Sequence, residues 1–113
     1  MRKSATAITP ETLRQWLESG RPLRLLDVRR APIYADAPDA LPGAAWRDPF
    51  AVDEWAGELD PALPIVVYCV HGHEISQNAA SALAATGFEA YTLAGGIEGW
   101  REAGGRVVPR AAP

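Results

Sequence analysis

The chain has 113 residues, a formal net charge of −3 and 48% hydrophobic residues, values typical of one globular domain with its own core and not of a disordered segment. The mild negative charge argues against a surface for nucleic acid or for an anionic membrane. No apolar run approaches the length of a membrane span, and no apolar stretch follows the basic start Met1-Arg2-Lys3, so we expect neither a membrane helix nor a signal peptide.

The first part of the chain predicts two strands separated by a helix. Residues 5–8 form a short strand, and Thr9-Pro10-Glu11 then supplies an N-cap, a proline and an acid in the first turn of a helix. Gly20 ends this helix, and residues 23–28 form a second, strongly apolar strand. Three residues of the helix are spaced to share one buried face: Leu13, Trp16 and Leu17.

The middle of the chain is less regular. Residues 31–43 are rich in alanine, proline and aspartate, which predicts a long irregular loop. Residues 44–46 form a brief strand, and residues 49–59 form a helix that Pro61 and Pro64 prevent from continuing. The expected core contacts of that helix are its large apolar residues, Phe50, Val52, Trp55 and Leu59.

The last part of the chain alternates strands and helices. Residues 65–68 are nearly all apolar, as in a strand buried on both faces, and residues 90–93 form another strand. A helix over 75–86 separates them, with Ile75, Ala79, Leu83 and Ala82 facing inward. A short helix follows over 97–103, and the tail 104–113 is expected to fray. This alternation predicts one α/β domain over residues 1–113, with a parallel sheet covered on both faces.

The only cysteine of the chain, Cys69, lies directly after the strand 65–68 and just before a helix. Ligands of parallel sheets bind beyond the carboxyl ends of the strands, and backbone amides and the dipole at a helix N-terminus favour negative charge. This setting favours a reactive thiolate and an anionic group beside the sulfur. A single cysteine also excludes an internal disulfide, and a free thiol indicates a reducing, cytoplasmic location.

Four stretches in the right order carry a family resemblance across nearly the whole chain. They are Leu25-Leu26-Asp27-Val28-Arg29, Leu41-Pro42-Gly43-Ala44, Val66-Val67-Tyr68-Cys69 with its loop, and Leu93-Ala94-Gly95-Gly96-Ile97-Glu98-Gly99-Trp100. In these stretches the chain resembles a single-domain rhodanese, a sulfurtransferase. The resemblance implies a central, mainly parallel five-stranded sheet with helices on both faces.

The same resemblance assigns roles to residues. Cys69 is expected to accept sulfane sulfur from a small donor as a persulfide and to pass it to a thiophilic acceptor, which is a thiol, cyanide or a protein thiol. No cofactor, nucleic acid or membrane is implied. The substrate-binding residues are expected to be those of the following loop, together with Arg29 at the end of the neighbouring strand: Val70, His71, Gly72, His73, Glu74 and Ile75.

The loop departs from the pattern of this family in its charges. Val70 and Glu74 stand where arginines are usual, and the loop instead carries His71 and His73. Histidines supply little fixed charge at pH 7, and Glu74 repels anions, so we expect thiosulfate to be a weaker donor than less charged persulfides. Arg29 or Arg30 is a candidate for the missing cation, although Asp27 and Arg29 equally fit a structural role, with Asp27 accepting from loop amides and Arg29 paired with a carboxylate.

The cysteine loop has three other interpretations. Cys69, His71 and His73 alternate, as metal ligands on an extended chain would, but a curled loop separates them and zinc ligands are usually spaced differently, so we expect no metal site. A cysteine-dependent phosphatase places an arginine six residues after the thiol, and that position is Ile75. A non-catalytic module that uses Cys69 for binding or for sensing redox state or persulfide remains the alternative to catalysis.

Overall fold

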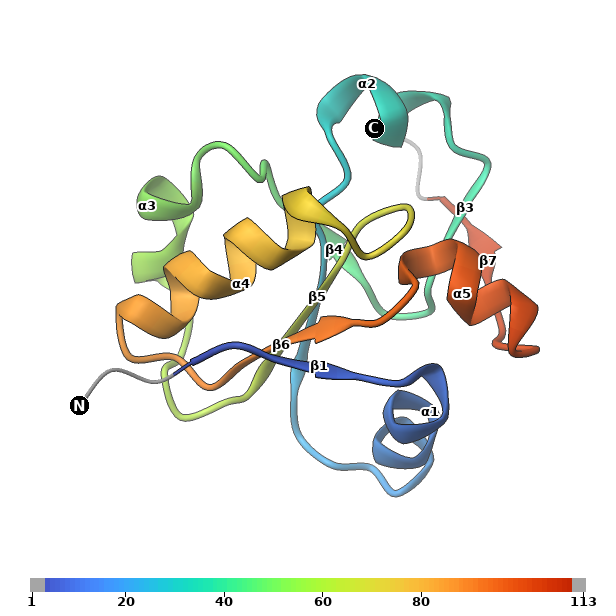
Figure 1. Ribbon diagram of the computed structural model, residues 1–113, viewed down its shortest axis with the longest axis horizontal. Coiled ribbons are helices and arrows are strands. Elements are labelled where there is room, and N and C mark those ends of the chain that lie inside the picture. Colours follow the sequence, from blue (N-terminus) through green and yellow to red (C-terminus); the bar gives the residue numbers. More distant parts are fainter. Residues whose placement is uncertain (1–3, 111–113) are drawn as a thin grey trace.

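A five-stranded parallel sheet forms the centre of the computed structural model, which describes residues 4–110 (Figure 1). The strand order is β1-β6-β5-β2-β4, and every neighbouring pair runs parallel. The strands are β1 (Thr6–Ile8), β2 (Arg24–Asp27), β4 (Ala45–Trp46), β5 (Ile65–Tyr68) and β6 (Ala90–Leu93). The predicted α/β fold with a parallel sheet is confirmed, and β5 and β6 have the predicted bounds.

Helices cover both faces of this sheet because alternate residues of the central strand β5 point to opposite sides. Ile65 and Val67 belong to the core formed with α3 (Val52–Trp55), the short helix η1 (Ala56–Glu58) and α4 (Glu74–Ala85). Val66 and Tyr68 belong to the core formed with α1 (Pro10–Glu18) and α5 (Gly96–Glu102). Strand β5 and the residue that follows it are therefore held from both sides.

The segment expected to be an irregular loop contains a helix, α2 (Ala31–Asp36), at the carboxyl end of β2. Pro32 stands in its first turn, where a proline is tolerated. Tyr34 of this helix stacks on Trp46 with ring centroids 5.3 Å apart. This contact between distant residues stabilises a helix that the composition of the segment does not predict.

Three predicted core residues are exposed. Phe50 is 73% exposed because the carboxylate of Asp48 accepts from the Phe50 amide, and this turn delays the start of α3 to Val52. Leu17 is 37% exposed, since α1 buries Leu13 fully and packs Trp16 against Tyr91. Ala82 lies on the outer side of α4.

The segment 104–110, which we expected to fray, is folded back onto the domain. The indole nitrogen of Trp100 donates to the Arg106 carbonyl (2.7 Å). Strand β7 (Val108–Pro109) pairs antiparallel with β3 (Asp39–Ala40) in a small second sheet. Residues 111–113 of the predicted tail lie outside the described residues. Within residues 4–110, no helix has the length and apolar character needed to cross a membrane.

Candidate active site

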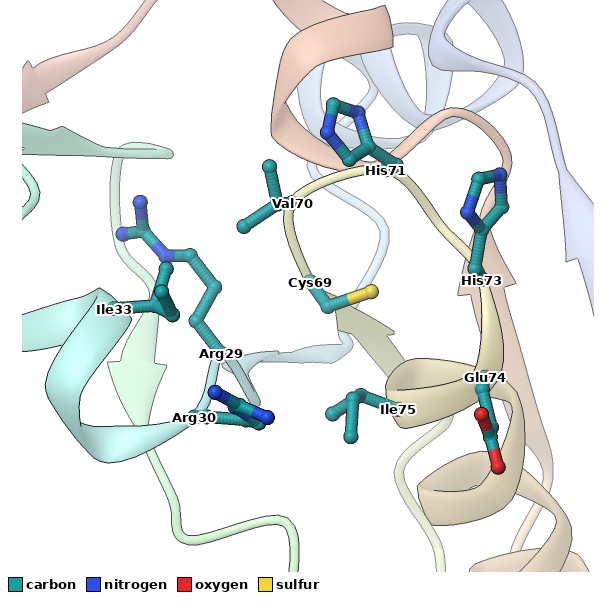
Figure 2. Close-up of a pocket in the computed structure, with 9 residues that line it drawn as sticks. All are labelled: Arg29, Arg30, Ile33, Cys69, Val70, His71, His73, Glu74 and Ile75. Atoms are coloured by element: carbon teal, nitrogen blue, oxygen red, sulfur yellow. The ribbon is translucent and has the colours of Figure 1, made fainter.

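Cys69 lies at the carboxyl end of β5, the central strand of the sheet, and only 7% of the residue is exposed. It stands at the wall of a pocket of about 260 Å³ between α2 and the start of α4 (Figure 2). The pocket brings together the residues that the sequence singled out, except Gly72, and adds Ile33 from α2. Its lining residues are Arg29, Arg30, Ile33, Cys69, Val70, His71, His73, Glu74 and Ile75.

The backbone of Cys69 and Val70 is held by α5 through the carbonyl groups of these two residues. The Cys69 carbonyl accepts from the amide of Ile97 (2.9 Å), and the Val70 carbonyl accepts from the amide of Glu98 (3.1 Å). Among residues 4–110, no backbone carbonyl accepts from the amides of residues 70–73, and the first bond of α4 runs from the Gln77 amide to the His73 carbonyl (3.1 Å). The amides from 70 to 76 are therefore left for another acceptor.

Two glycines let the loop lie directly on the turn before α5. Gly72 has a φ of +75°, and a Cβ there would lie 2.8 Å from the Gly95 nitrogen and 2.9 Å from the Leu93 carbonyl oxygen. Gly96 has a φ of +60°, and its Cβ would lie 2.5 Å from the Cys69 carbonyl oxygen. Gly72 thus fits the loop against this turn, and the binding of substrate by its amide stays a prediction.

Ser76, the third residue of α4, is fully buried and its hydroxyl oxygen lies 3.1 Å from Cys69 Sγ. The hydroxyl also lies 3.5 Å from the His73 carbonyl, its only other acceptor among the residues the structure describes. As a thiol, Cys69 donates to Ser76; as a thiolate, it accepts from Ser76. The sequence pattern assigned no catalytic role to Ser76. Its place in the first helical turn after the thiol was the signal for this contact.

Arg29 does not present its charge to the pocket. Its guanidinium donates to both carboxylate oxygens of Asp27, with distances of 2.6–3.0 Å, and to the Asp39 carbonyl (2.9 Å). Arg29 and Asp27 are 2% and 1% exposed. Burial opposes the charge of Arg29, but the hydrogen bonds and the charge of Asp27 hold the pKa of this guanidinium above its ordinary value. The structural role considered for this pair is the one observed.

The polar residues of the loop lie at the rim of the pocket. His71 and His73 are exposed, with ring centroids 5.9 Å apart. Figure 2 shows the carboxylate of Glu74 directed away from the sulfur of Cys69. Within the part of the chain that the structure describes, no three histidine, cysteine or acidic side chains are grouped so that they could hold a metal ion. The loop therefore contributes adaptable polar groups and no fixed positive charge.

The chain is similar to proteins of one known family over most of its length. The family model of the rhodanese-like domain matches residues 9–103. The chain is 36% identical over 95 residues to the thiosulfate sulfurtransferase GlpE of Pseudomonas paraeruginosa, covering 83% of this chain and 82% of that protein. The corresponding protein of Pseudomonas fluorescens is 35% identical over 95 residues, with 83% of each chain covered.

Solved structures with the same fold include proteins from two bacteria. A full-length protein from Lactobacillus plantarum superimposes with a TM-score of 0.81 at 32% identity, covering 91% of this chain and 87% of that one. The thiosulfate sulfurtransferase of Pseudomonas aeruginosa superimposes with a TM-score of 0.74 at 29% identity, covering 96% of this chain but 20% of that longer one. The match thus extends over the sheet, the cysteine loop and the turn that supports it.

Proposed function

We propose that this chain, a sulfurtransferase that belongs to the rhodanese-like family, carries sulfane sulfur as a persulfide on Cys69 and passes it to a thiophilic acceptor. The observation that carries this proposal is the environment of the Cys69 sulfur. The sulfur lies beside the Ser76 hydroxyl, in a pocket whose loop has the carbonyls of Cys69 and Val70 bound to amides of α5 and the amides of residues 70–73 without backbone acceptors. Such a site stabilises an anion on sulfur.

In the first step, the Cys69 thiolate attacks the outer sulfur of the donor. A bond forms between Cys69 Sγ and that sulfur, the bond between the sulfur and its carrier breaks, and the carrier leaves with the electron pair. With thiosulfate as donor, sulfite leaves and Cys69 holds a persulfide anion. The amides of residues 70–76 and the N-terminus of α4 would then hold the terminal sulfur, which is one bond farther into the pocket.

In the second step, an acceptor nucleophile attacks the terminal sulfur of the persulfide. The S–S bond breaks, its electron pair returns to Cys69 Sγ, and the thiolate is regenerated, so the donor and acceptor react in a ping-pong sequence. The acceptor is a small thiol, cyanide or a protein thiol. A free, catalytic thiol needs reducing surroundings, and we therefore place the reaction in the cytoplasm.

The mass of the intact protein tests this proposal directly. After treatment with thiosulfate or with cysteine persulfide and removal of excess donor, the chain is expected to gain the mass of one sulfur atom. Cyanide is expected to remove that mass and to yield one equivalent of thiocyanate. Cys69→Ser, the matched control, gains no sulfur. A wild-type chain that gains no sulfur from either donor would instead be the binding or sensing module considered above.

A further inference from the structure

We propose that Arg30 binds the oxyanion part of the sulfur donor and so determines which donors the enzyme prefers. This inference rests on the proposed persulfide chemistry, because the donor must lie within reach of Cys69. It assigns the recognition of charge to the N-cap of α2, across the pocket from the cysteine loop, rather than to the loop itself.

The need for such a residue follows from the charges that line the pocket. The loop over residues 70–75 contains a glutamate and no lysine or arginine, and histidine carries little fixed charge near neutral pH. Two arginines reach the pocket, Arg29 and Arg30. Since the guanidinium of Arg29 is buried against Asp27, Arg30 is the cation of this pocket that a donor can reach.

The side chain of Arg30 is exposed, and it takes part in no ion pair, side-chain hydrogen bond or ring contact described for residues 4–110. Figure 2 shows its guanidinium extended toward Ile75, at the side of the pocket opposite the histidines. Glu74 lines the same pocket but forms no ion pair with Arg30. The five N–H groups of a guanidinium form a planar fork that matches two oxygens of a sulfonate-type anion.

The backbone below this side chain is fixed on both sides. The Arg29 carbonyl accepts from the indole nitrogen of Trp46 (2.8 Å), and the Arg30 carbonyl accepts from the Tyr34 amide (2.9 Å). The stacking of Tyr34 on Trp46 joins these two anchors. Arg30 therefore starts from a defined position while its guanidinium is free to follow a bound anion, which suits a residue that recognises donors of different size.

Two donors that react in the same way but differ in charge distinguish charge recognition by Arg30 from a general effect of the substitution on the pocket. The dianion thiosulfate and the monoanion methanethiosulfonate each transfer one sulfur to Cys69; the S–S bond breaks, and sulfite or methanesulfinate leaves with the electron pair. For Arg30→Gln we expect the KM for thiosulfate to rise by about tenfold, the KM for methanethiosulfonate to rise less, and kcat with cyanide to stay within about twofold of wild type. Arg30→Lys, which keeps the charge, is expected to recover most of the affinity.

Arg14→Gln is the matched control, because Arg14 is an exposed arginine of α1 that does not line the pocket. It is expected to leave both KM values unchanged. If Arg30→Gln forms the Cys69 persulfide at an unaltered thiosulfate KM, Arg30 has no part in donor binding although the sulfur chemistry stands. Equal KM increases for both donors, without recovery in Arg30→Lys, would likewise overturn the inference. If the wild-type chain forms no persulfide, both the inference and the proposed function fail.

Discussion

Ser76 Oγ lies 3.1 Å from Cys69 Sγ, and both residues are buried at the junction of β5 and α4. This hydroxyl is a polar group in hydrogen-bonding contact with the sulfur, and it adds no charge to the site. When the proton leaves the thiol, the Ser76 hydroxyl can turn from the His73 carbonyl to the sulfur. The pair thus connects the proposed nucleophile with the first turn of the helix that follows it.

Replacement of Ser76 by alanine tests the value of this contact. Hydrogen bonds to charged groups contribute about 1.5–3 kcal/mol, so for Ser76→Ala we expect kcat/KM for sulfur transfer to fall by about 10- to 100-fold. Alanine is a better helix former than serine, and the thermal unfolding midpoint should change little. Ser81→Ala, at an exposed position of α4, controls for the substitution itself. Equal kcat/KM values for wild type and Ser76→Ala would show that the hydroxyl does not stabilise the reacting sulfur.

The close contacts of Gly72 with the turn before α5 predict a loss of activity when this glycine is replaced. Gly72→Ala combines a left-handed backbone with a collision against Gly95 and Leu93, so the loop must move and sulfur transfer should fall by at least about tenfold. Gly20 has a similar φ of +72° but nothing within 4 Å of the added Cβ. Gly20→Ala should therefore lose only about 1–2 kcal/mol of folding free energy and retain its activity.

Two measurements separate these effects. Urea unfolding gives the stability of each variant, and kcat/KM is measured at a temperature where both variants are folded. A Gly72→Ala variant that keeps full activity would contradict the close fit between the loop and the turn. The same would follow if Gly20→Ala lost as much activity as Gly72→Ala, because the loss would then come from the backbone conformation alone.

The ion pair of Asp39 with Arg101 predicts a pH-dependent contribution to stability. The hydrogen bonds from Arg101, more than its charge, lower the pKa of Asp39 from its ordinary value of 3.8, against a smaller opposing effect of burial. A carboxyl whose pKa is lower in the folded state contributes stability above its unfolded pKa and loses it as pH falls through the folded value. For Arg101→Gln we therefore expect a loss of about 0.5–1 kcal/mol at pH 7 that disappears under strongly acidic conditions.

Urea unfolding of wild type and Arg101→Gln across this pH range measures the difference. Arg106→Gln, at an exposed arginine, serves as the control for loss of one positive charge. If the difference in unfolding free energy between wild type and Arg101→Gln stays constant from neutral to strongly acidic pH, the ion pair with Asp39 does not cause the loss of stability. Arg101 also forms an ion pair with Glu98. Glu98→Gln keeps the pair of Arg101 with Asp39, so the stability that is lost at acidic pH should remain in this variant.

Glu74 is the acidic residue of the loop, and a positive charge at this position should improve the use of anionic donors. Glu74→Arg replaces a negative charge at the rim of the pocket with a positive one, and kcat/KM for thiosulfate should rise by about threefold to tenfold. The gain is limited because Glu74 is exposed to solvent and directed away from the sulfur. Glu18→Arg, an exposed position at the end of α1, makes the same change in net charge and should have no effect. A normally folded Glu74→Arg that shows no gain would refute this account of selectivity.

The sequence by itself determined the elements that short-range patterns specify. The apolar run 65–68 became β5 with its predicted bounds, and so did residues 90–93 in β6. The helix predicted from Ile75 begins one residue earlier, at Glu74. The parallel sheet and the place of Cys69 at a strand end followed from the order of these elements. Such features depend on side-chain periodicity and on residues close in the chain, so they can be predicted without coordinates.

Only the tertiary structure decided how the same residues divide their roles. The sequence offered Arg29 or Arg30 as a pocket cation and placed only Arg29 among the substrate-binding residues, whereas the fold buries Arg29 on Asp27 and leaves Arg30 at the pocket. The sequence alone could not show that Gly72 lies against Gly95, or that β7 pairs with β3, which is far from it in the chain. The physical reason is that burial, ion pairing and close backbone approach depend on groups far apart in sequence, and those groups meet only when the sheet and its helices have packed.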